Sequence, residues 1–344
     1  MVTSKKIEWI DIAKGIGILL VVYGHCQPPL VVNKFIYAFH MPLFFFISGY
    51  LFSRRKKEFK PFLNGKIKRL LVPYFVFSIL SIPIQYLRFR MGEIDSFTFR
   101  EMFFGLFNLD GTVIFNRPIW FLMAMFVSLL LFYFVSRLPV AGQIISALAG
   151  AGIAIFVSAQ HVRLPFGIDV ALLAFIFIVI GYQSKPFISK IENSKLQSKI
   201  LMLLLSVAVT FIFSQMHNRN RMGSVDIDNW LYFYIASFSG ILMTLVVSWM
   251  INTSRVLRYL GVKSLAIMVN HFYVLSFFGI VLIVTGYKEF LFVNYPGMTS
   301  LLYFAVYLIC MIPAIWIYDF IENAANSILY ERKLPSFNAT FKKV

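Results

Sequence analysis

Charged residues are scarce in this chain. Only 14% of its 344 residues are Asp, Glu, Lys or Arg, against 59% hydrophobic residues and a mean hydropathy of +0.78. A soluble domain carries about 25% charged residues, so the composition excludes an ordinary soluble protein. Acidic residues are the scarcer kind, 15 against 32 Lys and Arg, which gives a net charge of +17. In a membrane protein such an excess belongs to cytoplasmic loops, and we therefore expect no nucleic-acid partner.

Cysteine and the common catalytic motifs are also nearly absent. Cys26 and Cys310 lie far apart, within or beside apolar runs, and we expect two buried free thiols. The sequence has no Gly-rich phosphate loop, no Gly-x-Ser-x-Gly elbow, and no histidine with a carboxylate or histidine three or four positions away. These absences argue against a P-loop enzyme, a serine hydrolase and a zinc enzyme, so we expect neither a metal nor a bound cofactor.

Long hydrophobic runs fill most of the chain. A membrane-spanning helix needs about 20 mostly apolar residues. Runs of that kind fall at about 9–26, 35–53, 70–87, 118–137, 143–160, 168–184, 199–215, 230–251, 264–286 and 300–320. The sequence thus predicts an all-α, polytopic membrane protein of about ten transmembrane helices, with residues 1–344 as a single transmembrane domain and an uncleaved first helix. The longest polar gap, 88–117, contains FTFREMFFGLF, which predicts a short interfacial helix.

Lys and Arg are unevenly divided between the gaps that separate these runs. With the N-terminus inside, 22 of the 32 fall in cytoplasmic segments, nine fall in outer segments, and Lys14 lies within the first helix. This bias agrees with ten spans and with cytoplasmic N- and C-termini. The largest contribution comes from loop 54–69, RRKKEFKPFLNGKIKR. That loop either sets the topology and attracts anionic membrane lipid, or serves as a landing site for an anionic substrate.

The first apolar run carries ionisable residues that a simple anchor would lack. Lys14 and His25 lie at the two ends of KGIGILLVVYGH, which on a helix places them about 20° apart on one face and roughly 16 Å apart along the axis. Asp11 lies on the same side, about 60° from Lys14. A charge at the bilayer centre costs about 2.5–3.5 kcal/mol, and pairing with Asp11 would lower that cost for Lys14. The stripe is either a buried polar seam between helices or a cavity that crosses much of the membrane.

Three other runs carry polar groups in apolar surroundings. A lone buried histidine is usually explained by packing, and a Trp near a helix end by interface anchoring. Three intramembrane histidines together with a Lys–Asp pair are harder to explain in this way and indicate a functional site. The further residues of this set are His40 and Ser48 in FHMPLFFFISGYLF, Arg117 and Trp120 in RPIWFLMAMF, and Asn270 and His271 in LAIMVNHFYVL.

Two more histidines lie outside the apolar runs. His161 and His217 fall in outer loops, and we expect both to be solvated. An imidazole held in a polar seam, by contrast, suits removal of a proton from a hydroxyl by a general base.

Five blocks of the sequence resemble the integral-membrane acyltransferase 3 family. IDIAKGIGILLVVYGH is similar to its opening motif, a basic residue followed after ten positions by histidine, and FHMPLFFFISGYLF is similar to its second block. IKRLLVPYFVFS, IWFLMAMF and LAIMVNHFYVL resemble its third, fourth and late histidine blocks. The opening looks most like the fucose O-acetylase-like members. The first basic position is more often arginine in that family, and lysine keeps the charge but loses the bidentate fork.

The resemblance implies a ten-helix enzyme of the bacterial cytoplasmic (inner) membrane that moves an acyl group, usually acetyl from acetyl-CoA, to a sugar hydroxyl of a surface polysaccharide or another cell-envelope glycan. His25 is then the catalytic residue, as general base or acyl relay, and His40 or His271 orients it or stabilises developing charge. Lys14, Arg69 and Trp120 match donor-side positions. Asp11, Ser48 and Asn270 would support the site. Either this chain completes the transfer onto a glycan or lipid-linked sugar, or a separate extracytoplasmic transferase does so.

The sequence also allows two other classes of function. A transporter or flippase for a glycan or lipid-linked intermediate would also line a cavity with scattered polar groups. Such proteins more often contain internal repeats, and the sequence has none that we can identify. A receptor or scaffold that uses loop 54–69 would leave the three intramembrane histidines unexplained.

Overall fold

The protein folds as an all-α membrane protein in a computed structural model that describes residues 8–53, 58–92, 97–107 and 117–330. Its first half contains α1 (Glu8–His25), α2 (Leu30–Tyr37), α3 (His40–Tyr50), α4 (Phe59–Lys66), the π-helix η1 (Ile67–Leu71), α5 (Val72–Arg90), α6 (Phe99–Phe107), the 3₁₀ turn η2 (Arg117–Ile119), α7 (Trp120–Val135) and α8 (Val140–Ala159). Its second half contains η3 (Pro165–Gly167), α9 (Ile168–Gln183), α10 (Lys185–Glu192), α11 (Leu196–Gln215), β1 (Asn220–Arg221), η4 (Met222–Ser224), β2 (Asp226–Ile227), α12 (Trp230–Ile251), α13 (Arg255–Val262), α14 (Ser264–Val284), α15 (Tyr287–Asn294) and α16 (Pro296–Tyr330).

Nine helical segments of the described chain are long and apolar enough to cross a membrane. They coincide with nine of the ten predicted runs, from 30–50 to 296–323. The remaining run is α1, which has 18 residues and carries Glu8, Asp11 and Lys14. The short interfacial helix predicted in the gap 88–117 is present as α6. The class of fold predicted from the sequence is therefore confirmed.

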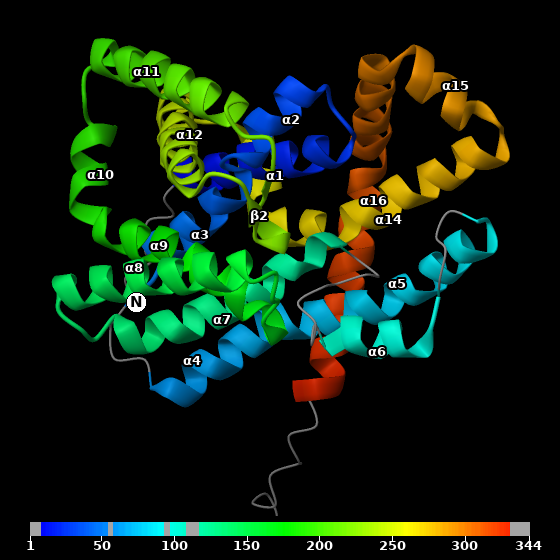
Figure 1. The fold of residues 1–344 in the computed structure, drawn as a ribbon, viewed down its shortest axis with the longest axis horizontal. Coiled ribbons are helices and arrows are strands. Elements are labelled where there is room, and N and C mark those ends of the chain that lie inside the picture. Colours follow the sequence, from blue (N-terminus) through cyan, green and yellow to red (C-terminus); the bar gives the residue numbers. More distant parts are fainter. Residues whose placement is uncertain (1–7, 54–57, 93–96, 108–116, 331–344) are drawn as a thin grey trace, which may run out of the picture.

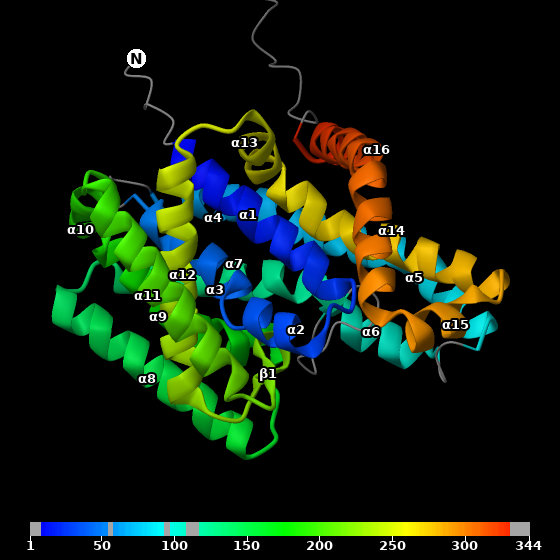
Figure 2. The ribbon, with the colours of Figure 1, turned by 90° about the horizontal axis from the view of Figure 1, so that it is seen from above.

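Helix α1 lies inside the bundle. It packs against α3, α12, α13 and α14, and Figure 2 shows it running between α12 on one side and α14 on the other. Eleven of its residues are buried, including Trp9, Asp11 and Ile18. Neighbouring helices therefore shield most of α1, including Asp11, from the surroundings of the bundle.

The run predicted as one helix at 35–53 is broken in two. Helices α2 and α3 meet at Ala38 and Phe39 (Figure 1). Pro42 explains the break, because proline lacks the N–H that would bond to the carbonyl of Ala38 and its ring collides with that carbonyl. The freed oxygen of Ala38 accepts a hydrogen bond from the Ser237 hydroxyl of α12 at 2.6 Å. A distant helix thus satisfies the backbone group that the break exposes.

The basic segment predicted as loop 54–69 is helical from Phe59 onward. Helix α4 continues through the π-helix η1 into α5, so the helix begins eleven residues before the predicted start of this span. Pro73 gives a reason for the π-helical turn, since a wider turn relieves the clash of a proline ring with the carbonyl four residues earlier. The four basic residues at 54–57, Lys5, Lys6 and the basic tail at 331–344 lie outside the described residues.

Glycines bring two pairs of helices into backbone contact. A Cβ atom on Gly15 would lie 2.1 Å from the Leu257 carbonyl oxygen, and one on Gly261 would lie 1.7 Å from the Asp11 carbonyl oxygen. These reciprocal contacts join α1 to α13. The same arrangement joins α3 to α9, where Gly49 lies against the backbone of Ile178 and Gly181 against the backbone of Phe46. Any side chain at these positions would separate the helices.

Between α11 and α12 the chain forms a small hairpin. Strands β1 and β2 pair antiparallel, with Asn220 opposite Ile227 and Arg221 opposite Asp226. Cys26 is buried and Cys310 is half-buried, and both are free thiols. His161 is exposed, as predicted.

We expect Gly49→Ala to lower the free energy of unfolding by about 1–3 kcal/mol, the usual cost of overpacking. The added Cβ would lie 2.0 Å from the carbonyl oxygen of Ile178, and backbone cannot move aside as a flexible side chain can. Melting of the detergent-solubilised protein, followed by size-exclusion chromatography, measures the change.

Gly152→Ala is the matched control. Gly152 lies within α8 and has nothing within 4 Å of the added Cβ. Alanine should be neutral there, or stabilise by up to about 1 kcal/mol through helix propensity. Equal melting temperatures for the two variants would contradict the assignment of the α3–α9 contact.

Candidate active site

The polar stripe predicted on the first helix is present on α1. Lys14 Nζ lies 2.9 Å from Asp11 Oδ1, and their side chains are 22% and 9% exposed. The predicted ion pair is therefore confirmed. His25 is the last residue of α1 and is exposed. One helix thus holds a shielded ion pair in its first half and an accessible imidazole at its opposite end.

Three histidines from three helices gather at the end of α1. The ring centroid of His25 lies 5.1 Å from that of His271 on α14 and 6.2 Å from that of Tyr37 on α2. The Tyr37 ring lies 5.0 Å from His40 on α3. His40 and His271 are buried, 3% and 0% exposed, so His25 is the accessible imidazole of the cluster. The three histidines singled out in the sequence therefore lie near one another, and their roles stay a prediction.

Backbone carbonyls fix the tautomers of the two buried histidines. His40 Nδ1 donates to the carbonyl oxygen of Ile36 at 2.7 Å, and His271 Nδ1 donates to that of Ile267 at 3.3 Å. A carbonyl can only accept, so each Nδ1 carries the proton and each Nε2 presents a lone pair in the neutral ring. The Nε2 atom of His271 is buried without a hydrogen-bond partner in the described part of the chain.

His25 and His40 line a cavity with a volume of about 910 Å³. Its walls come from α1, α2, α3, η2, α7, α14 and the segment 217–224, together with Gln27 and Arg163, and they include Tyr37 and Trp120. All the loops that line the cavity lie on the side that the distribution of Lys and Arg predicts to be outside. This volume falls within the range of small-molecule pockets, roughly 300–1,000 Å³.

The other predicted site residues are spread over the molecule. Trp120 lines the cavity of His25, and its indole packs against Gly223 of the hairpin segment. Lys14, Arg69, Ser48 and Asn270 are not among the described residues that line the cavity. Arg69 is exposed on η1 and Ser48 is half-buried on α3. Asn270 donates to the Ala314 carbonyl oxygen at 3.0 Å and so ties α14 to α16.

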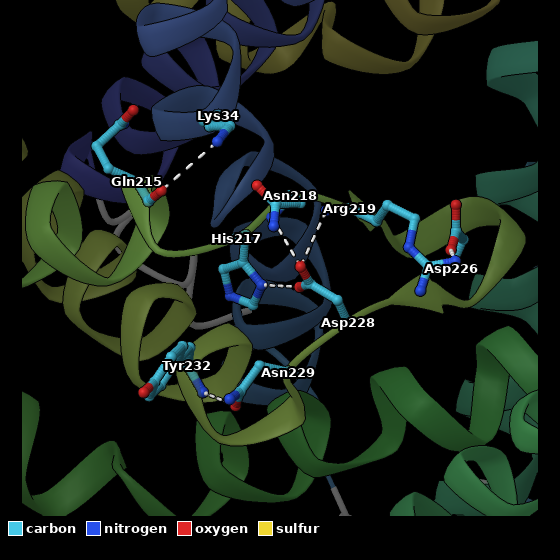
Figure 3. Close-up of polar contacts among 9 residues, drawn as sticks. All are labelled: Lys34, Gln215, His217, Asn218, Arg219, Asp226, Asp228, Asn229 and Tyr232. Carbon is cyan, nitrogen blue, oxygen red and sulfur yellow. Dashed lines mark hydrogen bonds and ion pairs between the residues drawn. The ribbon is translucent and has the colours of Figure 1, made fainter.

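The prediction that His217 is solvated is wrong. Its side chain is fully buried, and Nδ1 donates to Asp228 Oδ1 at 2.7 Å (Figure 3). Asp228 Oδ2 accepts hydrogen bonds from the backbone N–H groups of Asn218, at 2.7 Å, and Arg219, at 3.3 Å. Partial burial opposes ionisation of Asp228, but these three donors outweigh it and lower its pKa to about 2. The pair closes the base of the hairpin that borders the cavity.

Sequence reasoning missed Tyr37 and the arginines of the hairpin. Tyr37 lies between His25 and His40 because α2 turns back toward α1 after the short connection at 26–29. The segment NRNRM in the loop after α11 was the available signal, since two arginines next to asparagines are unusual between two apolar runs.

The chain matches the family described as an acyltransferase domain over residues 7–319. It therefore belongs to this family of integral-membrane acyltransferases, and the resemblance drawn from the five sequence blocks is confirmed. The protein is a multi-pass membrane protein of this family.

Two curated relatives are each named nodulation protein NolL. The one from Mesorhizobium japonicum is 31% identical over 142 residues, which is 38% of this chain and 36% of the relative. The one from Sinorhizobium fredii is 27% identical over 212 residues, which is 58% of this chain and 54% of the relative. The chain thus spans about a third to about half of the length of these relatives. No solved structure matches it.

The carboxylate of Asp228 should make the stability of the protein depend on acidity. Its pKa is lower in the folded protein than its ordinary value of 3.8, so its contribution is complete above about pH 4 and is lost as the pH falls from about 4 to about 2. Asp228→Asn should therefore show a smaller fall in melting temperature than wild type across this interval.

Asp226→Asn provides the comparison on the same hairpin. Asp226 lies 3.4 Å from Arg219 Nη1, whose side chain is 65% exposed, and such exposed pairs contribute little. The melting temperatures of wild type, Asp228→Asn and Asp226→Asn are measured between pH 2 and pH 6. An acid-dependent loss in Asp228→Asn as steep as in wild type would show that the His217–Asp228 pair does not carry this effect.

Proposed function

We propose that this protein is a membrane O-acyltransferase of the bacterial cytoplasmic membrane that uses acetyl-CoA or another short acyl-CoA. The acyl group moves to a hydroxyl of a sugar in a surface polysaccharide or another cell-envelope glycan. The observation that carries the proposal is the position of His25, which is exposed in a cavity of about 910 Å³ at the end of an otherwise largely buried helix. Membership of an acyltransferase family favours this activity over transport.

His25 would act as a general base on the acceptor. The unprotonated nitrogen of its imidazole takes the proton of the sugar hydroxyl, and the oxygen attacks the carbonyl carbon of the thioester. The new C–O ester bond forms as the C–S bond breaks, and the imidazolium returns the proton to the departing thiolate to give free CoA. In the alternative sequence the imidazole itself attacks the thioester and passes the acyl group on from an acyl-histidine. Both reaction pathways need an accessible imidazole.

The buried histidines would support His25. His271 lies 5.1 Å from it, ring to ring, and keeps an unpartnered Nε2 lone pair in the described structure. A buried acceptor without a donor is costly, and an N–H of a His25 imidazolium would be its natural partner. His40 would orient Tyr37 and through it the rim of the cavity. Both are positioning roles in this proposal.

Acyl-CoA would bind along the first half of α1, away from the His25 end. Lys14 and Asp11 form their ion pair in the first half of the helix, roughly 16 Å along the axis from His25. We place the CoA arm along this face, with basic groups such as Arg69 near its phosphates. Trp120 borders the cavity of His25, which favours a role beside the acyl group rather than beside the nucleotide.

His25→Asn should lower acyl transfer and CoA release by about 10²–10⁴-fold, the usual contribution of a general base. Lys14→Ala should weaken acetyl-CoA binding. Purified protein in lipid with radiolabelled acetyl-CoA gives binding and CoA release as separate measurements.

His161→Asn is the matched histidine control. His161 is exposed and has a positive φ of 55°, a region that asparagine tolerates, so the exchange should be silent. Full activity of His25→Asn at normal expression would end the proposal. Failure of all variants and of wild type to bind acetyl-CoA would show that the donor is wrong.

A further inference from the structure

Five cations converge on the cavity of His25. They are Lys34, Arg117, Arg163, Arg219 and Arg221, and they come from α2, η2, the segment before η3 and the hairpin. These are five of the nine Lys and Arg that the charge bias leaves in outer segments. Among the described residues that line the cavity, none is Asp or Glu. The scarce outer cations therefore gather around one cavity instead of being spread over the surface.

Three of the five already have partners. Arg163 Nε lies 2.5 Å from Asp169 Oδ2, and its Nη2 donates to the Gly223 carbonyl oxygen at 3.2 Å, so it fastens the hairpin segment to α9. Arg219 lies 3.4 Å from the half-exposed carboxylate of Asp226 (Figure 3). Lys34 Nζ donates to the carbonyl oxygen of Gln215 at 3.5 Å, and no carboxylate of the described residues pairs with it.

Arg117 and Arg221 have no carboxylate partner in the part of the chain that the structure describes. Both are exposed and both line the cavity. The same cavity is lined by Tyr37 and His25, whose rings lie 6.2 Å apart. Two guanidinium groups without a carboxylate partner among the described residues therefore line the same cavity as His25.

Guanidinium groups at the walls of a cavity select anions. Each presents a planar fork that binds a phosphate or carboxylate through two parallel hydrogen bonds. Low-dielectric walls concentrate the field of several like charges inside a cleft. A neutral sugar needs hydroxyl and amide partners and gains little from such a field.

We propose that this cavity binds an anionic acceptor, with Arg117 and Arg221 holding a phosphate or carboxylate that the sugar carries close to the hydroxyl to be acylated. The inference rests on the proposed function and narrows its acceptor to acidic sugars or lipid-linked sugar phosphates. The donor also carries phosphates, but its proposed path follows the Lys14 half of α1.

The test uses full-length protein in lipid nanodiscs and measures binding without acyl transfer. One probe pair is a glucuronate-containing disaccharide and its neutral methyl ester. A second pair is a sugar 1-phosphate on a short isoprenyl chain and the corresponding neutral isoprenyl glycoside. We expect the anionic member of at least one pair to bind about tenfold or more tightly than its neutral partner, with the difference shrinking at high salt.

Arg117→Gln and Arg221→Gln should each weaken binding of that anionic probe about tenfold and leave the neutral probe unchanged. Arg100→Gln is the matched control, because Arg100 is an exposed cation on α6, predicted on the same side, that lies over Phe104 and does not line the cavity. The probe pair whose anionic member binds more tightly than its neutral member shows whether the acceptor is an acidic sugar or a lipid-linked sugar phosphate.

Equal binding of anionic and neutral probes would overturn the inference. So would a loss confined to acetyl-CoA binding in Arg117→Gln and Arg221→Gln, since the anion at this site would then belong to the donor. Wild-type protein that binds the anionic probe but never releases CoA would contradict the proposed function and leave the anion site in place.

Discussion

Contact between the backbones of α1 and α13 fixes the position on which the site depends. Gly15 and Gly261 leave no room for a Cβ atom, so the two helices approach as closely as their main chains allow. This contact sits beside Asp11 and Lys14 and sets the depth of α1 in the bundle. Since α1 is one rigid helix, the same contact also sets where His25 meets α2, α3 and α14. A shift of one turn, about 5.4 Å, would separate His25 from His271.

Enclosure by other helices explains why α1 can carry charge. An isolated helix with Asp11 and Lys14 would pay the insertion cost of each charge against lipid. In the bundle the two form an ion pair that neighbouring helices shield, and the pair is locally neutral. An ion pair of this kind need not add stability, so a simple anchor would gain nothing from it. Its presence on the helix that ends in His25 is better explained by the role in donor binding that we propose for this helix.

The sequence predicted the helices and singled out three intramembrane histidines, but it did not predict the shape of the outer cavity. Apolar length defined the spans, and helical spacing placed Lys14 and His25 on one face, because both depend on local periodicity. Pro42 causes the break before α3, but the hydroxyl that donates to the freed Ala38 carbonyl belongs to Ser237, 199 residues further along the chain. The burial of His217 depends on Asp228 across the hairpin, and spacing alone does not show that this loop folds back on itself. Long-range packing of this kind leaves no periodic signal in the sequence.

The charge of the outer cavity argues for a ligand on general physical grounds. Like charges that face one cavity raise the energy of the empty state by mutual repulsion, and outer cations also weaken the bias that orients the protein in the membrane. Arg163 has a structural task that accounts for its charge, because it fastens the hairpin segment to α9. Arg117 and Arg221 have no such contact to a carboxylate in the described structure. An anion bound between them would relieve the repulsion and supply the negative charge that the cavity lacks. The same anion would hold its sugar beside the single accessible imidazole of the cluster, so that one electrostatic arrangement would both select the acceptor and orient its hydroxyl.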